Sequence, residues 1–125
     1  MSIDLTNPIT DHELTMMPGS PAHPTFFGWI RLLNGNRDAG YVYLTDTPEK
    51  PHLSSQKEYI VTSIPVAMLQ TMLDVLRNER NLQIRFSATG GEDPAPSVFI
   101  ESRPREGADV TDARNKALLA RNGLA

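Results

Sequence analysis

Two runs of apolar and aromatic residues surround an Asn-Gly turn in the first half of the chain. Residues 25–33 read TFFGWIRLL and residues 39–45 read AGYVYLT, with Asn34-Gly35-Asn36 between them. Runs rich in aromatic and branched side chains on both sides of such a turn are typical of a β-hairpin. We therefore expect a hairpin in this part of the chain.

Alternation along this hairpin predicts which side chains share a face, because successive residues of a strand point to opposite sides. If Val42 and Leu44 face the core, Tyr41 and Tyr43 face away from it. An odd-length loop centred near residue 35 or 36 then fixes the first strand against the second. The residues expected on the tyrosine side are Phe27, Trp29 and Arg31. Those expected on the core side are Phe26, Ile30 and Leu32.

The sequence PVAMLQTMLDVLRNER at residues 65–80 predicts the main helix. Proline is favoured in the first turn of a helix, where its missing N–H costs nothing. Apolar residues then recur at the i, i+3, i+4, i+7 spacing of one helical face, and Gln70 lies on the opposite face. The apolar stripe consists of Val66, Leu69, Met72, Leu73 and Leu76.

Short runs on both sides of this helix predict further strands. Residues 59–63 precede it, and residues 82–87 alternate apolar with polar after it. A loop rich in Gly, Pro and acidic residues leads to residues 98–101, which alternate in the same way. These last two runs predict a second hairpin with a longer connection.

The two ends of the chain differ from its middle. Residues 1–24 contain four prolines, each of which removes a backbone donor, so we expect a flexible arm with little regular structure. Residues 109–125 are rich in Ala, Leu, Arg and Lys and have a high helix propensity. Because the apolar stripe of this segment is thin, we expect a C-terminal helix that docks on the rest of the protein.

These elements predict a single α+β domain over residues 25–108. We expect a small, mostly antiparallel sheet of about five strands, with the main helix on one face and the C-terminal helix docked on it. The strand–helix–strand passage at residues 59–87 also allows a crossover, so a mixed or barrel-like sheet is an alternative. A length of 125 residues fits one domain.

Composition and charge exclude several classes of protein. Twelve Lys and Arg against 15 Asp and Glu give a net charge of −3, which does not favour a basic nucleic-acid protein. The absence of Cys excludes disulfides, thiolate chemistry and cysteine-ligated zinc. The first ten residues lack the basic and apolar regions of a secretion signal, and no apolar run is long enough to span a membrane. We expect a soluble, cytoplasmic, acidic protein with no membrane partner.

No pattern of catalytic or ligand-binding residues is complete. His12, His23 and His52 lie in loop or proline-flanked segments, without the spacing of metal ligands. Gly90-Gly91 is followed by two acidic residues, which would repel a phosphate. The serines show no nucleophile elbow. We therefore expect no catalytic residue, no metal and no cofactor, and we expect that the protein is not an enzyme.

The outward face of the predicted sheet is the most informative feature. It combines aromatic rings with arginine, and it extends to the second hairpin if all strands share one sheet. The candidate interaction surface is Phe27, Trp29, Arg31, Tyr41, Tyr43, Arg85 and Phe99.

Three interpretations of this face are open. It is internal core covered by the tail or the arm, a protein-contact surface, or a stacking platform for single-stranded nucleic acid. Aromatic residues and arginine are enriched at protein interfaces, whereas the net acidity and only three lysines disfavour nucleic acid. We expect a non-catalytic protein–protein interaction module, adaptor-like or inhibitor-like, that contacts a partner or itself as a homo-oligomer. The alternatives are a single-stranded nucleic-acid-binding protein and a small enzyme or ligand-binding domain whose site follows no motif.

Overall fold

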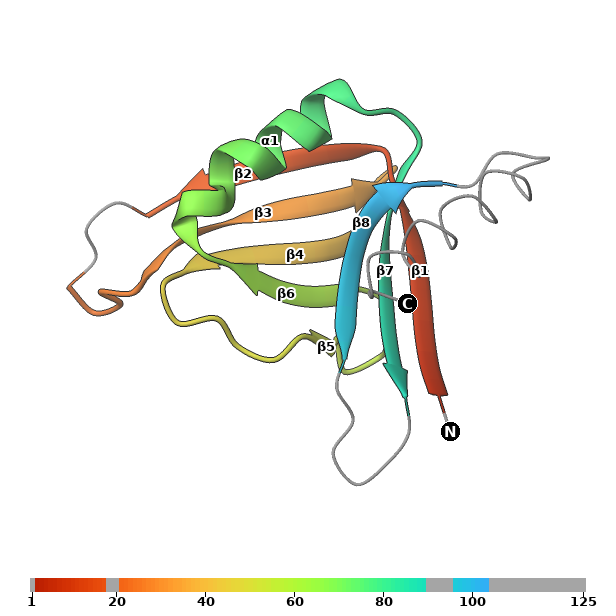
Figure 1. Ribbon diagram of the computed structural model, residues 1–125, viewed down its shortest axis with the longest axis horizontal. Helices are drawn as coiled ribbons and strands as arrows, with labels where there is room; N and C mark the ends of the chain where they lie inside the picture. The colour runs from red at the N-terminus through yellow and green to blue at the C-terminus, as the bar shows by residue number, and fades with distance from the viewer. Residues whose placement is uncertain (1, 18–20, 90–95, 104–125) are drawn as a thin grey trace, which may run out of the picture.

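The computed structural model describes residues 2–17, 21–89 and 96–103, which form two β-sheets and one α-helix (Figure 1). In chain order the elements are β1 (Ser2–Ile9), β2 (Asp11–Met16), β3 (Phe26–Asn34), β4 (Arg37–Thr45), β5 (His52–Leu53), β6 (Ile60–Ile64), a 3₁₀ turn (Val66–Met68), α1 (Leu69–Asn78), β7 (Leu82–Thr89) and β8 (Ser97–Ser102).

The strands form two open sheets rather than one. An antiparallel sheet has the order β1-β7-β8, and a five-stranded sheet has the order β2-β3-β4-β6-β5. The larger sheet is mixed, because β4 and β6 are parallel while its other neighbours are antiparallel. In Figure 1 the smaller sheet runs across one end of the larger one, and α1 connects the two.

The predicted α+β class is therefore confirmed, with a mostly β structure and one main helix. The expected single sheet of about five strands is wrong. The helix leads from β6 in one sheet to β7 in the other, so the strand–helix–strand passage is not a crossover within one sheet.

The N-terminal segment is also more regular than its prolines predict. Residues expected to form an irregular arm instead form β1, which pairs with β7, and β2, which pairs with β3. Pro8 lies in β1, the edge of its sheet, and an edge strand tolerates proline when the missing N–H would face away from the neighbouring strand. Leu5 and Ile9 of β1 pack in the core, and this burial stabilises the strand.

A corner at Thr10 lets the chain pass directly from one sheet to the other. The Thr10 amide donates to the Leu33 carbonyl oxygen at 2.7 Å, and its hydroxyl also donates to that oxygen at 3.2 Å. The same hydroxyl accepts a hydrogen bond from the Gly35 amide at 2.7 Å. The turn between β3 and β4 is thereby tied to the point where the two sheets meet.

Asn7 provides a second link between the sheets. Its side-chain amide donates to the carbonyl oxygens of Ala39 in β4 and of Glu58 before β6, each at 3.0 Å. Both acceptors belong to segments far from Asn7 in sequence, so this side chain fixes β1 across the larger sheet.

The core lies between the two sheets and α1. Side chains of both sheets form one cluster, which includes the fully buried Ile30, Val42 and Ile84. Leu73 and Leu76 of α1 are buried in the same cluster. The face of the five-stranded sheet that carries Ile30 and Val42 is therefore its inner face, and the opposite face is its outer face.

The main helix forms where its periodicity predicts, although it is shorter than expected. Pro65 precedes the 3₁₀ turn, α1 follows it, and the chain becomes extended at Glu79. Leu69 and Met72 are partly buried against the core, as the apolar stripe predicts. On the exposed side, the Gln70 side chain donates to Asp74 at 2.9 Å.

Among the described residues, no helix is both long and apolar enough to cross a membrane. The expected C-terminal helix at residues 109–125 lies outside the residues that the structure describes.

Candidate functional site

The hairpin of β3 and β4 brings the predicted aromatic residues together. A two-residue turn connects the strands, and Gly35 in this turn has a φ of 65°, which primed turns require. Next to the turn Leu33 pairs with Asp38, but an irregularity then shifts the register, so that Arg31 pairs with Tyr41 and Trp29 with Tyr43. A short turn and a bulge thus give the pairing that an odd-length loop would give.

A second bulge, between Phe26 and Gly28, changes which phenylalanine joins these residues. Phe26 pairs with Thr45, whereas Gly28 pairs with Leu44, so the alternation of β3 is broken between them. The Phe26 ring contacts the rings of Trp29 and Tyr43, and the expectation that Phe26 faces the core is wrong. Phe27, expected in this cluster, pairs with no aromatic ring in the described part of the chain.

Five aromatic rings form a continuous row on the outer face, which we call the aromatic strip: Tyr59, Tyr41, Tyr43, Phe26 and Trp29. Ring centroids along this row lie 5.3 Å, 6.3 Å, 5.5 Å and 6.3 Å apart in that order. Two of the four pairs are stacked, and such ring pairs stabilise beyond the area they bury. All five side chains are half-buried.

Tyr59 is the member of the strip that sequence reasoning missed. It precedes β6, in which Val61 pairs with Tyr41. Because alternate residues share a face, Tyr59 lies on the same side as Val61, and its ring meets that of Tyr41. The parallel pairing of β4 and β6 creates this contact, and it leaves no local signal in the sequence.

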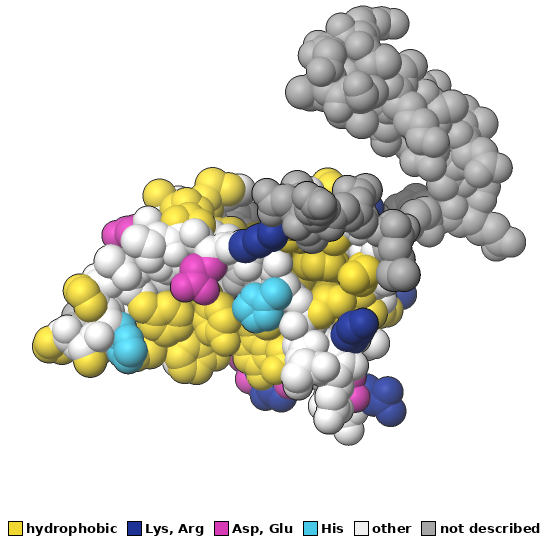
Figure 2. Space-filling view, turned by 90° about the horizontal axis from the view of Figure 1, so that it is seen from below, with side chains coloured by type: hydrophobic (Ala, Val, Ile, Leu, Met, Phe, Trp, Pro, Cys, Tyr) yellow, Lys and Arg dark blue, Asp and Glu magenta, His cyan; other side chains and the backbone are white. Residues whose placement is uncertain are grey.

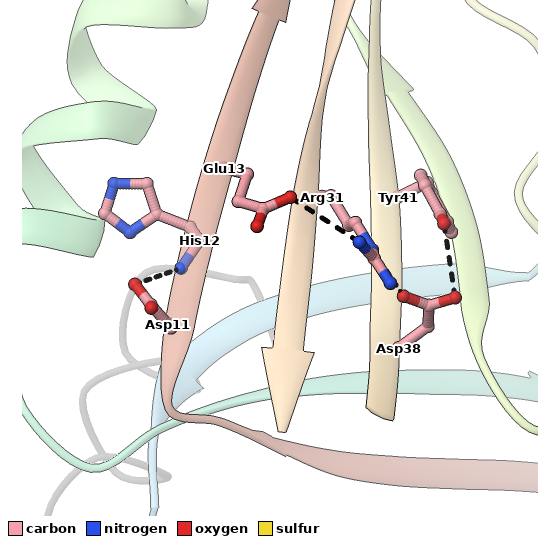
Figure 3. Close-up of polar contacts among 6 residues, drawn as sticks. All are labelled: Asp11, His12, Glu13, Arg31, Asp38 and Tyr41. Carbon is pink, nitrogen blue, oxygen red and sulfur yellow. Dashed lines mark hydrogen bonds and ion pairs between the residues drawn. The ribbon is translucent and has the colours of Figure 1, made fainter. Parts of the chain in front are cut away.

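A polar cluster borders the strip on the side of β2 (Figure 3). Arg31 donates to Asp38 at 2.6 Å and forms an ion pair with Glu13 at 3.5 Å, and the Tyr41 hydroxyl donates to Asp38 at 3.2 Å. The hydrogen bond to Asp38 raises the pKa of the Arg31 guanidinium, so Arg31 stays charged. Burial, together with the negative charge of Asp38, raises the pKa of Tyr41, so its hydroxyl stays a donor.

Arg85 and Phe99 lie apart from this site, in the three-stranded sheet, where they pair directly across β7 and β8. The expectation that they extend the aromatic face rested on one shared sheet and fails with it. The Arg85 guanidinium lies 4.2 Å from the centroid of the Phe99 ring and donates to Glu101 at 2.6 Å. This hydrogen bond lowers the pKa of Glu101, which also accepts from Gln83 at 3.1 Å.

The described residues contain no group of three or more His, Asp or Glu side chains that could hold a metal ion. His12 lies on β2, whereas His23 and His52 line one cavity of about 550 Å³ beside the aromatic strip. Glu49 is the one carboxylate among the residues that line this cavity. A pair of convergent carboxylates, which would favour acid–base catalysis, is therefore not part of its lining.

Comparison of the chain with known protein families, with curated proteins and with solved structures gives no significant match.

Proposed function

We propose that this chain is a non-catalytic protein-binding module that engages a protein surface through the aromatic strip. The position of the aromatic strip is the main support for this proposal. The second sheet and α1 pack on the inner face of the five-stranded sheet, whereas the five rings lie on its outer face. Trp and Tyr are the residues most enriched among those that dominate binding energy at protein interfaces.

The charges around the strip favour a protein partner over nucleic acid. Arg31, which could contact a phosphate, already forms ion pairs with Asp38 and Glu13. The whole chain carries a net charge of −3, whereas affinity for nucleic acid comes mainly from cations that neutralise phosphates. The strip therefore combines rings that could stack on bases with carboxylates that would repel the phosphates of a nucleic acid.

The polar cluster would fix the orientation of a partner bound to the aromatic strip. The Glu13 side chain is 60% exposed and that of Arg31 is 37% exposed, so both remain accessible at the border of the rings. An apolar centre with a partly exposed polar border is the usual anatomy of a protein interface. The same surface on a second copy of the chain would give a symmetric dimer, in which each strip contacts the other.

The experiment compares Trp29→Ala with Gln70→Ala, a matched control on the exposed side of α1. Self-association is measured by sedimentation velocity, and partner capture by quantitative affinity purification from native lysate. Loss of an interface tryptophan costs about 2 kcal/mol or more, so Trp29→Ala should weaken association about 30-fold, with an unchanged far-UV circular dichroism spectrum.

Gln70→Ala should retain both self-association and the captured partner. The proposal is wrong if the two variants behave alike. It is also wrong if Trp29→Ala instead abolishes a salt-sensitive affinity for single-stranded oligonucleotides, which would make the strip a stacking platform.

A further inference from the structure

A cavity of about 550 Å³ lies beside the aromatic strip, next to Tyr43 and Phe26, between the segment before β3 and the segment after β4. Phe26, Tyr43 and Val61 give it apolar walls, and its volume is within the range of small-molecule sites. In Figure 2 apolar side chains gather between two histidines on this side of the molecule.

Neighbouring rings hold the Phe26 wall of the cavity in place. Phe26 reaches it because of the bulge next to Gly28, and Trp29 stacks on the Phe26 ring at 6.3 Å. His23 meets the same ring edge-on, with centroids 6.5 Å apart. The ring of Phe26 is therefore fixed by neighbours on two sides before any ligand binds.

A threonine network holds the first polar wall. The Thr45 and Thr47 hydroxyls lie 3.2 Å apart, and the Thr47 hydroxyl donates to that of Thr25 at 3.5 Å. The Asp46 amide donates to the carbonyl oxygen of Thr25 at 3.0 Å. These bonds join two segments that are distant in sequence into one rigid border.

Ser63 holds the second polar wall. Its hydroxyl accepts from the Glu49 amide at 3.0 Å and donates to the Glu49 carbonyl oxygen at 3.3 Å. This double contact fixes the segment after β4 against β6, close to the place where His52 pairs with Val61. Lys50 and His52 are thereby kept on the border of the cavity.

We propose that this cavity binds a small ligand that combines a flat apolar ring with one negatively charged group. Phe26, Tyr43 and Val61 supply the surface for the ring. Three lining side chains, His23, Lys50 and His52, can donate hydrogen bonds to a negatively charged group, and Glu49 is the one carboxylate in the lining. An anionic group at the border therefore meets more hydrogen-bond donors than carboxylates, and the Thr25 hydroxyl can supply a further hydrogen bond.

The test uses 4-phenylbutyrate as the probe and its neutral amide, 4-phenylbutyramide, as the matched compound. The chain has one Trp, so the indole N–H signal of Trp29 in a ¹H–¹⁵N NMR spectrum is a single reporter behind the Phe26 ring. The proposal predicts a saturable shift of this signal by the acid, with a Kd on the order of 1 mM or tighter, and weaker binding of the amide.

Two pairs of variants locate the site. Phe26→Ala should abolish binding of both compounds, whereas Phe99→Ala, which removes an exposed ring from the other sheet, should leave it unchanged. His52→Ala should weaken binding of the acid about threefold to tenfold without affecting the amide, and His12→Ala should affect neither. Isothermal titration calorimetry provides the affinities, and circular dichroism checks the fold.

The proposal is overturned if the wild-type protein shows no saturable shift. It is equally overturned if the acid and the amide bind alike, because the donors at the border would then not favour a negatively charged group. Equal effects of His12→Ala and His52→Ala, or of the two phenylalanine variants, would place the ligand elsewhere.

Discussion

Replacement of Gly28 by alanine tests how the chain builds its outer face. Gly28 has a φ of 142°, a backbone conformation that residues other than glycine rarely adopt. A Cβ atom there would overlap the carbonyl oxygen of Thr15 in β2 and would lie 3.0 Å from the Cα atom of Met16. Both obstacles are backbone atoms of the neighbouring strand, so they cannot turn away as a flexible side chain could.

The cost of this change has two parts. The backbone strain of an unfavourable φ contributes about 1–3 kcal/mol. The overlap forces β2 away from β3 and weakens one or two backbone hydrogen bonds, each worth about 0.5–1.5 kcal/mol. We therefore expect Gly28→Ala to lower the free energy of unfolding by about 1.5–6 kcal/mol.

Gly35→Ala is the matched control. Gly35 also has a positive φ, but a Cβ atom at this position would meet nothing within 4 Å. It should therefore cost only about 1–2 kcal/mol, the strain of the left-handed conformation alone. Urea denaturation followed by Trp29 fluorescence and far-UV circular dichroism gives both free energies. Equal losses of stability in the two variants, within about 0.5 kcal/mol, would show that the overlap with β2 does not destabilise the protein.

Three further variants test the core, the link between the sheets and the second sheet. Leu73→Ala in α1 should cost about 2–5 kcal/mol in a denaturant melt, while the exposed Gln70→Ala should cost under about 0.5 kcal/mol, and similar losses would mean that the helix packs by another face. Asn7→Ala leaves two carbonyl oxygens without their donor, so a loss of about 1–3 kcal/mol is expected, and a neutral result would show that this link does not stabilise the fold. Glu101→Gln should cost about 0.5–1 kcal/mol at neutral pH, because ion pairs this exposed contribute little. Because folding lowers the pKa of Glu101, the difference in stability between the two proteins should be complete above the ordinary pKa of 4.5. It should be lost as the pH falls from 4.5 through the lowered pKa of the folded protein. A difference in stability that persists in acid would contradict the ion pair of Glu101 with Arg85 as its cause.

Local patterns predicted much of the larger sheet. The Asn-Gly turn and the alternation of residues 39–45 were sufficient to place Trp29 and Arg31 on the same face as Tyr41 and Tyr43, and in the structure Trp29 pairs with Tyr43 and Arg31 with Tyr41. The shift to a helical period at residues 65–80 predicted α1 and the burial of Leu73 and Leu76. These features depend on neighbours in sequence, which is why the sequence reveals them.

The features that sequence reasoning missed depend on contacts between distant segments. Leu5 and Ile9 alternate as a strand requires, but the prolines around them obscured the signal, and the partner strand β7 begins more than 70 residues later. The bulge that turns Phe26 outward did leave a trace, because a lone glycine within a strand pattern often marks a bulge. No comparable trace marks the cavity, whose walls join Thr25 to Thr47 and Ser63 to Glu49.

The division into two sheets also limits the candidate surface. The Arg85 guanidinium lies over the Phe99 ring across β7 and β8, and it donates a hydrogen bond to Glu101. The aromatic strip instead extends to Tyr59, and two of its other rings, Tyr43 and Phe26, line the cavity. The surface that the fold presents is therefore shorter than the sequence predicts, but more densely aromatic.

Crosslinking can record directly what lies against the outer face in the cell. A photo-crosslinking residue, p-benzoylphenylalanine, is placed at Thr15, which is exposed and pairs with Trp29 across β2 and β3. The same residue at Gln70 on α1 is the control. Irradiation should join position 15, but not position 70, to a protein or to a second copy of the chain, and Trp29→Ala should remove this adduct. Absence of any adduct at position 15, or the same adducts at both positions, would contradict the claim that the aromatic strip is a protein-binding surface.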